Sequence, residues 1–169
     1  MAQLSQIQVS FAPVEDRLLL RLSTSDNAEY RFWLTRRYSK VLVPKLYESA
    51  AAITKTQTPV TPGAQREVLD FQREAAIQQS DFKTPFKEED KHFPFGDSPV
   101  LLTQFELKTG ASGIQLGLTA GDGTRFDLAL DLRLIHSLMQ LVEKALDAAD
   151  WELPEAHKTT DTPSSHVVN

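Results

Sequence analysis

Apolar and polar residues alternate in six short stretches of the chain, and this pattern predicts six β-strands. From Gln6 to Ser10, Ile7 and Val9 point to one side while two glutamines and a serine point to the other. A period of two is typical of a strand with one buried face. The other five predicted strands comprise residues 17–23, 30–34, 100–107, 113–119 and 125–130.

Two long stretches have apolar residues at helical spacing instead. Thr35 and Asp131 precede them, and each can accept a hydrogen bond from the first free amides of a helix. We therefore expect helices from Arg36 to about Ile53 and from Leu132 to Trp151. Pro44 lies inside the first helix and predicts a kink there or a restart one residue earlier.

The middle of the chain has a different composition. Residues 54–63 hold two prolines and several threonines and are interpreted as a linker, and Ala64 to Gln79 contains good helix formers and predicts a third helix. Residues 81–99 carry four aromatic rings among prolines and charges, which is unusual for a disordered segment. Two interpretations stay open for it: a long loop held on the domain by its rings, or a segment that binds a partner. The rings belong to Phe82, Phe86, Phe93 and Phe95.

An offset of 96 residues aligns the two ends of this pattern without a gap. Residues 9–46 then lie on residues 105–142, so that apolar positions, turns, capping residues and helices coincide. Chance similarity between two hairpins of one class is the alternative, but the shared register favours an internal repeat.

The predicted fold is therefore α+β: two βββα repeats form a pseudo-twofold antiparallel sheet domain of about six strands with helices packed on it. The repeats comprise residues of about 5–53 and 99–151, and residues 54–98 join them. Residues 1–153 would form a single globular domain, and residues 154–169 are predicted to be a disordered tail.

Composition limits the function classes. The 169 residues include no cysteine, which removes disulfides and thiol chemistry and agrees with a reducing cytoplasm. No apolar stretch is long enough to span a bilayer and no export signal is readable, so we expect a cytoplasmic protein without membrane contact. A net charge of −5 disfavours a generic polyanion binder.

Candidate chemistry is sparse, and we expect a non-enzymatic protein with no cofactor and no metal site. His136 is the one histidine on a firmly predicted element, where it is interpreted as a surface residue of the helix. No pair of histidines has metal-ligand spacing, and the acids of residues 88–90 are typical of a solvated loop.

The outward face of the first three strands combines basic and aromatic residues. Arg17, Arg21, Arg31 and Trp33 lie there in the predicted register, and three cations begin the adjoining helix. Together with three rings of the middle segment they form the candidate binding set. The helix residues are Arg36, Arg37 and Lys40, and the rings are those of Phe86, Phe93 and Phe95.

Three uses of this face remain open. Its arginines could pair internally with Asp127, Glu106 or the acids of residues 88–90, or they could contact an unidentified protein partner. The third is single-stranded nucleic acid, with guanidinium groups on phosphates and a base stacked on the indole ring.

The paired layout of strands followed by a helix is similar in topology to the PUR and Whirly families. Those families bind single-stranded nucleic acid with duplicated units, which have four strands where three are predicted here. We expect a protein-binding or adaptor module, with single-stranded nucleic-acid binding as the alternative and a monomer or homodimer as the assembly.

Overall fold

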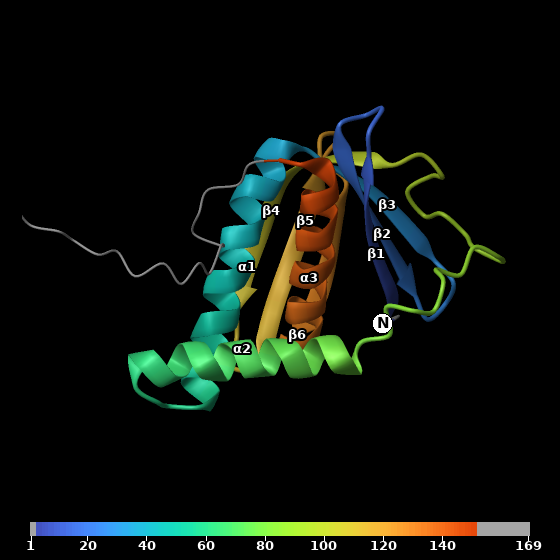
Figure 1. The fold of residues 1–169 in the computed structure, drawn as a ribbon. Coiled ribbons are helices and arrows are strands. Elements are labelled where there is room, and N and C mark those ends of the chain that lie inside the picture. Colours follow the sequence, from blue (N-terminus) through green and yellow to red (C-terminus); the bar gives the residue numbers. More distant parts are fainter. Residues whose placement is uncertain (1–2, 152–169) are drawn as a thin grey trace, which may run out of the picture.

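The computed structural model describes residues 3–151, which form six strands and three helices (Figure 1). Alternation is clearest in the last strand, where Leu128 and Leu130 are buried and the residues on either side of each are exposed. Thr35 and Asp131 precede the first and third helices as capping residues. The elements are β1 (Leu4–Ala12), β2 (Arg17–Thr24), β3 (Glu29–Leu34), α1 (Arg36–Gln57), α2 (Pro62–Gln79), β4 (Val100–Thr109), β5 (Gly113–Ala120), β6 (Arg125–Asp131) and α3 (Leu132–Ala149).

The six strands make one mixed sheet in the order β1-β2-β3-β4-β5-β6. Two antiparallel triplets, β1–β3 and β4–β6, meet where β3 pairs in parallel with β4. The expectation of an antiparallel sheet is therefore wrong at its centre. The parallel contact is possible because the chain between β3 and β4 is long enough to return to the same end of the sheet.

Helices α1 and α3 lie side by side over one face of the sheet, and α2 crosses near their ends (Figure 1). Each long helix packs beyond its own strand triplet: α1 contacts β4 and β5, while α3 contacts β1 as well as β5 and β6. The two triplets consequently share one core. Its largest fully buried side chains are Phe32, Leu18, Leu22, Leu34, Leu46, Ile53, Leu102, Leu116, Leu118, Leu130, Ile135 and Met139.

The helix boundaries differ somewhat from the expected ones. Helix α1 runs through Pro44 without a restart and ends at Gln57, so the connection to α2 is shorter than the predicted linker. Helix α3 ends before Trp151, because Asp150 adopts a left-handed conformation. The indole of Trp151 then packs against Phe11 and donates a hydrogen bond to Asp16 at 3.0 Å.

The α+β class, the six strands and the three helices agree with the sequence prediction. The predicted disordered tail, residues 154–169, lies outside the described residues. Within residues 3–151, no helix combines the length and apolar character that crossing a membrane requires.

Candidate binding surfaces

A buried carboxylate organises the outer face of the first strand triplet. Arg21 and Arg31 lie opposite each other on β2 and β3, and Glu29 is on the same face of β3. Like charges at opposed positions repel, but Glu29 Oε1 accepts from Arg21 Nε at 2.8 Å and from Arg31 Nε at 2.7 Å. Glu29 has no solvent exposure, and Arg21 is 8% exposed. Two of the predicted site residues are therefore brought together by an acid that was not predicted.

The segment of residues 81–98, called here the covering segment, lies over this cluster on the side of the sheet away from the helices (Figure 1). Glu88 accepts two hydrogen bonds from Arg21, at 2.8 and 2.7 Å, in a bidentate arrangement. The ring of Phe86 stacks on the Arg21 guanidinium at 4.2 Å, and the ring of Phe93 stacks on that of Arg31 at 4.7 Å.

The covering segment is held by its rings, as one of the two interpretations expected. Phe95 packs edge-on against Tyr30 and Phe32 of β3 and also against Phe126 of β6. The arginines thus have internal partners, and these are Glu29 and Glu88. The other acids considered from the sequence, Glu106 and Asp127, pair with Arg125 instead.

The charges of the cluster stabilise one another. Burial alone would raise the pKa of Glu29, but the hydrogen bonds from Arg21 and Arg31 outweigh it and leave that pKa below its ordinary value. The hydrogen bond from Arg21 likewise lowers the pKa of Glu88. Both carboxylates are therefore ionised at neutral pH, and the two guanidinium groups are neutralised.

The other predicted cations are not drawn into this cluster. Arg17 is half-buried at the start of β2, and Arg36 and Arg37 are exposed in the first turn of α1. None of the three forms an ion pair within the described part of the chain. Trp33 is partly buried on β3, and Lys40 is partly buried on α1.

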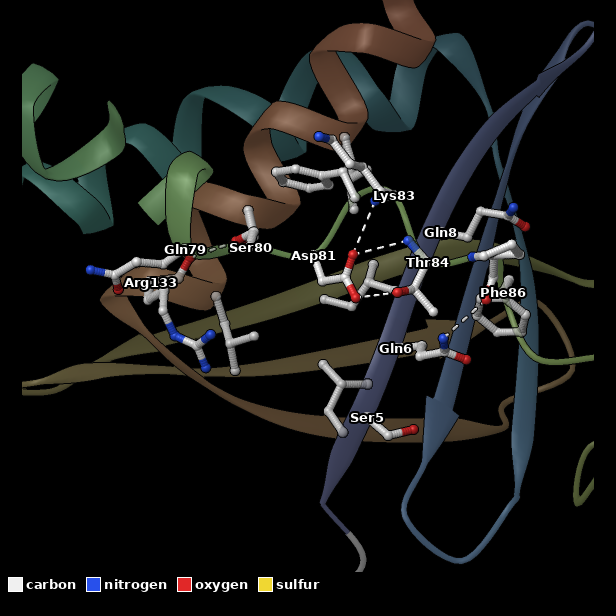
Figure 2. A pocket seen from close by; sticks show the side chains of 17 residues that line it. Ser5, Gln6, Gln8, Gln79, Ser80, Asp81, Lys83, Thr84, Phe86 and Arg133 are labelled. Carbon is white, nitrogen blue, oxygen red and sulfur yellow. Dashed lines mark hydrogen bonds between the residues drawn. The ribbon is translucent and has the colours of Figure 1, made fainter. Parts of the chain in front are cut away.

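A groove of about 500 Å³ opens beside the covered face (Figure 2). Figure 2 shows β1 with Ser5, Gln6 and Gln8 on one side and the ends of α2 and α3 with Gln79 and Arg133 on the other. The first residues of the covering segment, among them Asp81 and Thr84, run between these two sides. We call this groove the β1 groove. Its lining residues are Leu4, Ser5, Gln6, Ile7, Gln8, Gln79, Ser80, Asp81, Phe82, Lys83, Thr84, Pro85, Phe86, Arg133, Leu134, Ser137 and Leu141.

The β1 groove follows an unpaired edge of the sheet. Strand β1 is first in the strand order and has β2 as its one strand neighbour. In an antiparallel pair, alternate residues direct their N–H and C=O groups away from the partner strand. Residues on both faces of β1, such as Ile7 and Gln8, line the same groove, which places the groove along the strand's free edge.

Three helices meet at a second polar cluster. Arg73 of α2 contacts Glu143 of α3 and the hydroxyl of Tyr47 of α1, and Tyr47 also donates to Glu143. Burial, together with the neighbouring Glu143 carboxylate, raises the pKa of Tyr47 to about 12. The cluster connects the three helices through hydrogen bonds and one ion pair.

His136 is buried, so the expectation of a surface histidine is wrong. Helix α2 packs against α3, and the imidazole is 1% exposed, with no hydrogen-bond partner for either nitrogen among the described residues. Burial and the nearby Arg73 charge lower its pKa to about 4. The ring is therefore neutral at pH 7. Within residues 3–151, no group of three or more His, Asp or Glu side chains could hold a metal ion.

The sequence analysis missed Glu29 and the free edge of β1. Alternation along β3 places Glu29 on the face of Arg31 and Trp33, which was a usable signal. The order of the strands, in contrast, is set by pairing between distant segments and has no local signal. A comparison of the chain with protein-family models, with curated proteins and with solved structures finds no match.

Proposed function

We propose that this chain is a non-enzymatic binding or adaptor module that contacts another protein through the β1 groove. The observation that carries the proposal is the edge of β1 that pairs with no other strand and that lines a groove, together with α3 and the first residues of the covering segment. An open strand edge offers a row of backbone donors and acceptors, and proteins use such edges to bind extended segments of other chains.

The size and lining of the groove support a contact site. A volume of about 500 Å³ falls in the range of binding pockets, ~300–1,000 Å³. Apolar side chains of α3, Leu134 and Leu141, stand beside polar groups of β1, and Phe82 is 40% exposed at the rim. The lining thus combines apolar side chains with a larger number of polar ones, which can give a contact specificity through hydrogen bonds.

We also propose that the two strand triplets with their helices are copies of one unit. Strands β2 and β3 and helix α1 begin at Arg17, Glu29 and Arg36, and their counterparts begin 96 residues later in each case. Two pairs of residues at this same spacing contact each other. These pairs are Tyr47 with Glu143 and Tyr30 with Phe126.

Contacts between equivalent positions support a pseudo-twofold relation, because a residue near a twofold axis meets its own counterpart. In such an arrangement the β3–β4 pairing would have a counterpart between β6 and β1. No strand pairing between β6 and β1 occurs in residues 3–151. The open β1 edge is thus the side on which the two halves differ.

Single-stranded nucleic acid remains the alternative prediction for the outer face of the first triplet. The ion pairs of Arg21 and Arg31 weigh against it, since phosphates would have to displace Glu29 and Glu88. A labelled oligonucleotide at low salt tests it directly: we expect no change in anisotropy, whereas tight binding that weakens steeply with salt would favour the alternative.

A photo-crosslinking experiment tests the protein contact. A photoreactive amino acid at Gln79, which is exposed and lines the groove, should give discrete adducts in cells that express the chain. The same amino acid at Gln115, which is exposed on β5 and distant from the groove lining, is the matched control. Equal adducts from both positions, or none from Gln79, would contradict the proposal.

A further inference from the structure

We propose that the segment bound in the β1 groove is an extended acidic peptide of the partner protein, which adds to the sheet as a strand beside β1. This inference rests on the proposed function and specifies its ligand. It depends on two independent features, the character of the β1 edge and the charges of the groove.

Strand β1 lacks most of the features that prevent strand addition. Natural edge strands are protected by charged residues, proline, bulges or a loop that covers them. Here the covering segment contacts β1 at the Gln6 side chain. Residues 4–12 contain no charge and no proline over nine positions, and a single register shift occurs near Leu4. The opposite edge, β6, carries three charged and exposed residues in seven. These are Arg125, Asp127 and Asp131.

This contrast identifies β1 as the edge suited to pairing. Glutamine and serine on its outward face keep the strand compatible with water without repelling another backbone. The covering segment approaches β1 through a side chain rather than through the strand's backbone: Gln6 donates to the Pro85 carbonyl at 3.4 Å and accepts from the Lys87 amide at 3.0 Å. Apart from the Ala12 carbonyl, which accepts from the Glu15 amide in the turn to β2, no backbone group of β1 pairs with a loop backbone among the described residues.

The groove has two cations that form no close ion pair, and one of them, Lys83, interacts with Asp81 through its charge alone. Neither Lys83 nor Arg133 forms an ion pair in the described part of the chain. The one acid of the lining, Asp81, is already occupied, because it accepts from the amides of Lys83 and Thr84 at 3.1 and 2.9 Å. These local hydrogen bonds, chiefly those from Thr84, lower the pKa of Asp81.

Arg133 is also at the end of a helix where a cation is unfavourable. It is the second residue of α3, and the first turn of this helix contains no acidic residue. The positive end of the helix dipole repels a guanidinium group and attracts an anion. Asp131 already caps this helix end by accepting from the Leu134 amide at 2.7 Å. The charge argument for an acidic ligand therefore rests on the side chains of Lys83 and Arg133, which form no ion pair in the described part of the chain.

Selection from a random peptide library tests the inference without assuming a sequence. Twelve-residue peptides displayed on phage are selected on the full immobilised chain, and the recovered peptides are synthesised and titrated. We expect Asp and Glu to be enriched among residues spaced two apart, because alternate side chains of a strand share a face.

A double charge reversal, Lys83→Glu with Arg133→Glu, should weaken the selected peptides about tenfold or more. The matched control is Arg36→Glu with Arg37→Glu. It makes the same change of charge at two exposed cations in the first turn of α1, outside the groove lining. Affinity in this control should equal that of the unaltered chain.

Amide hydrogen exchange determines whether the peptide adds as a strand. Binding should slow exchange at alternate residues of β1 and leave β6 unchanged. Acidic peptides that bind without protecting β1 would overturn the strand addition. Peptides that protect β1 but carry no acidic preference would overturn the ligand class and leave the proposed function intact.

Two further results would overturn the proposal at the level of the groove itself. If no peptide is enriched and the chain is monomeric, the groove does not bind peptides and the proposed function fails with it. If sedimentation shows a dimer whose β1 amides are protected without peptide, the edge pairs with a second copy of this chain.

Discussion

The outer faces of the two strand triplets have the same register but opposite arrangements of charge. On β2 and β3, Arg21 lies opposite Arg31, and on β5 and β6, Gly117 lies opposite Asp127. The first face places a carboxylate between two guanidinium groups. The second places one guanidinium, that of Arg125, between two carboxylates, Asp127 and Glu106, each 2.9 Å away.

The difference in burial follows from what lies above each face. Glu29 is covered by the arginines and by residues 81–98, whereas the side chains around Arg125 are half exposed. Gly117 makes room for this guanidinium, since a Cβ at that position would lie 2.5 Å from Arg125 Nη2. One face has therefore become part of the interior, and the other remains a solvated surface.

Removing one carboxylate from each face should give the largest contrast. Glu29→Ala leaves two guanidinium groups without their shared partner in a buried site, which should cost about 3–5 kcal/mol of unfolding free energy. Asp127→Ala removes an exposed partner and should cost about 1 kcal/mol or less. Urea unfolding followed by circular dichroism measures both, and equal losses would show that the two faces are energetically alike.

Much of the fold could be predicted because its signals are local. Alternation gave the six strands, and the oxygens of Thr35 and Asp131 cap helices at the expected residues, accepting from the amides of Tyr38 and Leu134. The parallel pairing of β3 with β4 involves two residue pairs between segments far apart in sequence. No local pattern specifies such a contact, so the antiparallel prediction failed there.

The candidate site was predicted in part for the same reason. Outward alternation identified Arg21 and Arg31, and the unusual number of rings identified Phe86 and Phe93. Which ring meets which arginine depends on the path of a long segment. The burial of Glu29 depends on the path of the same segment. In the sequence, Glu29 directly precedes the predicted strand of residues 30–34, and no local pattern showed that it would lie at the centre of the cluster.

The two long helices differ in a way that pH can measure. At the position 96 residues after Lys40 of α1, which is half-buried, α3 buries His136 as a neutral ring. Its pKa of about 4 in the folded chain lies below the value of ~6.5 in the unfolded chain. The unfolded chain therefore takes up the proton first, and folded stability falls as pH decreases between these values.

The loss of unfolding free energy that His136 causes should reach roughly 3 kcal/mol by pH 4, and there should be no such loss above pH 7. Urea unfolding at several pH values gives the unfolding free energy as a function of pH. Between pH 6.5 and 4.5 this free energy should fall with decreasing pH in the unaltered chain, and it should fall less steeply in His136→Leu. Carboxylates with a lowered pKa, such as Glu29, also contribute to folded stability, but this contribution is lost at lower pH, as the pH falls below ~4.3. Identical slopes for the two proteins in the upper window would contradict the burial of a neutral ring.

The smallest expected effect on stability concerns the covering segment, which lies over the first strand triplet and has no counterpart over the second among the described residues. Phe93→Ala removes the ring stacked on Arg31 and should weaken attachment of residues 81–98 by about 1 kcal/mol, which corresponds to roughly fivefold faster proteolysis within that segment. The control is Phe82→Ala, because that ring is 40% exposed. Faster cleavage with a nearly constant global unfolding free energy would show that the covering segment opens locally. The Glu29 cluster then becomes exposed to solvent while the sheet stays folded. Equal cleavage rates for the two variants would mean that the stacked rings do not attach the covering segment to the sheet.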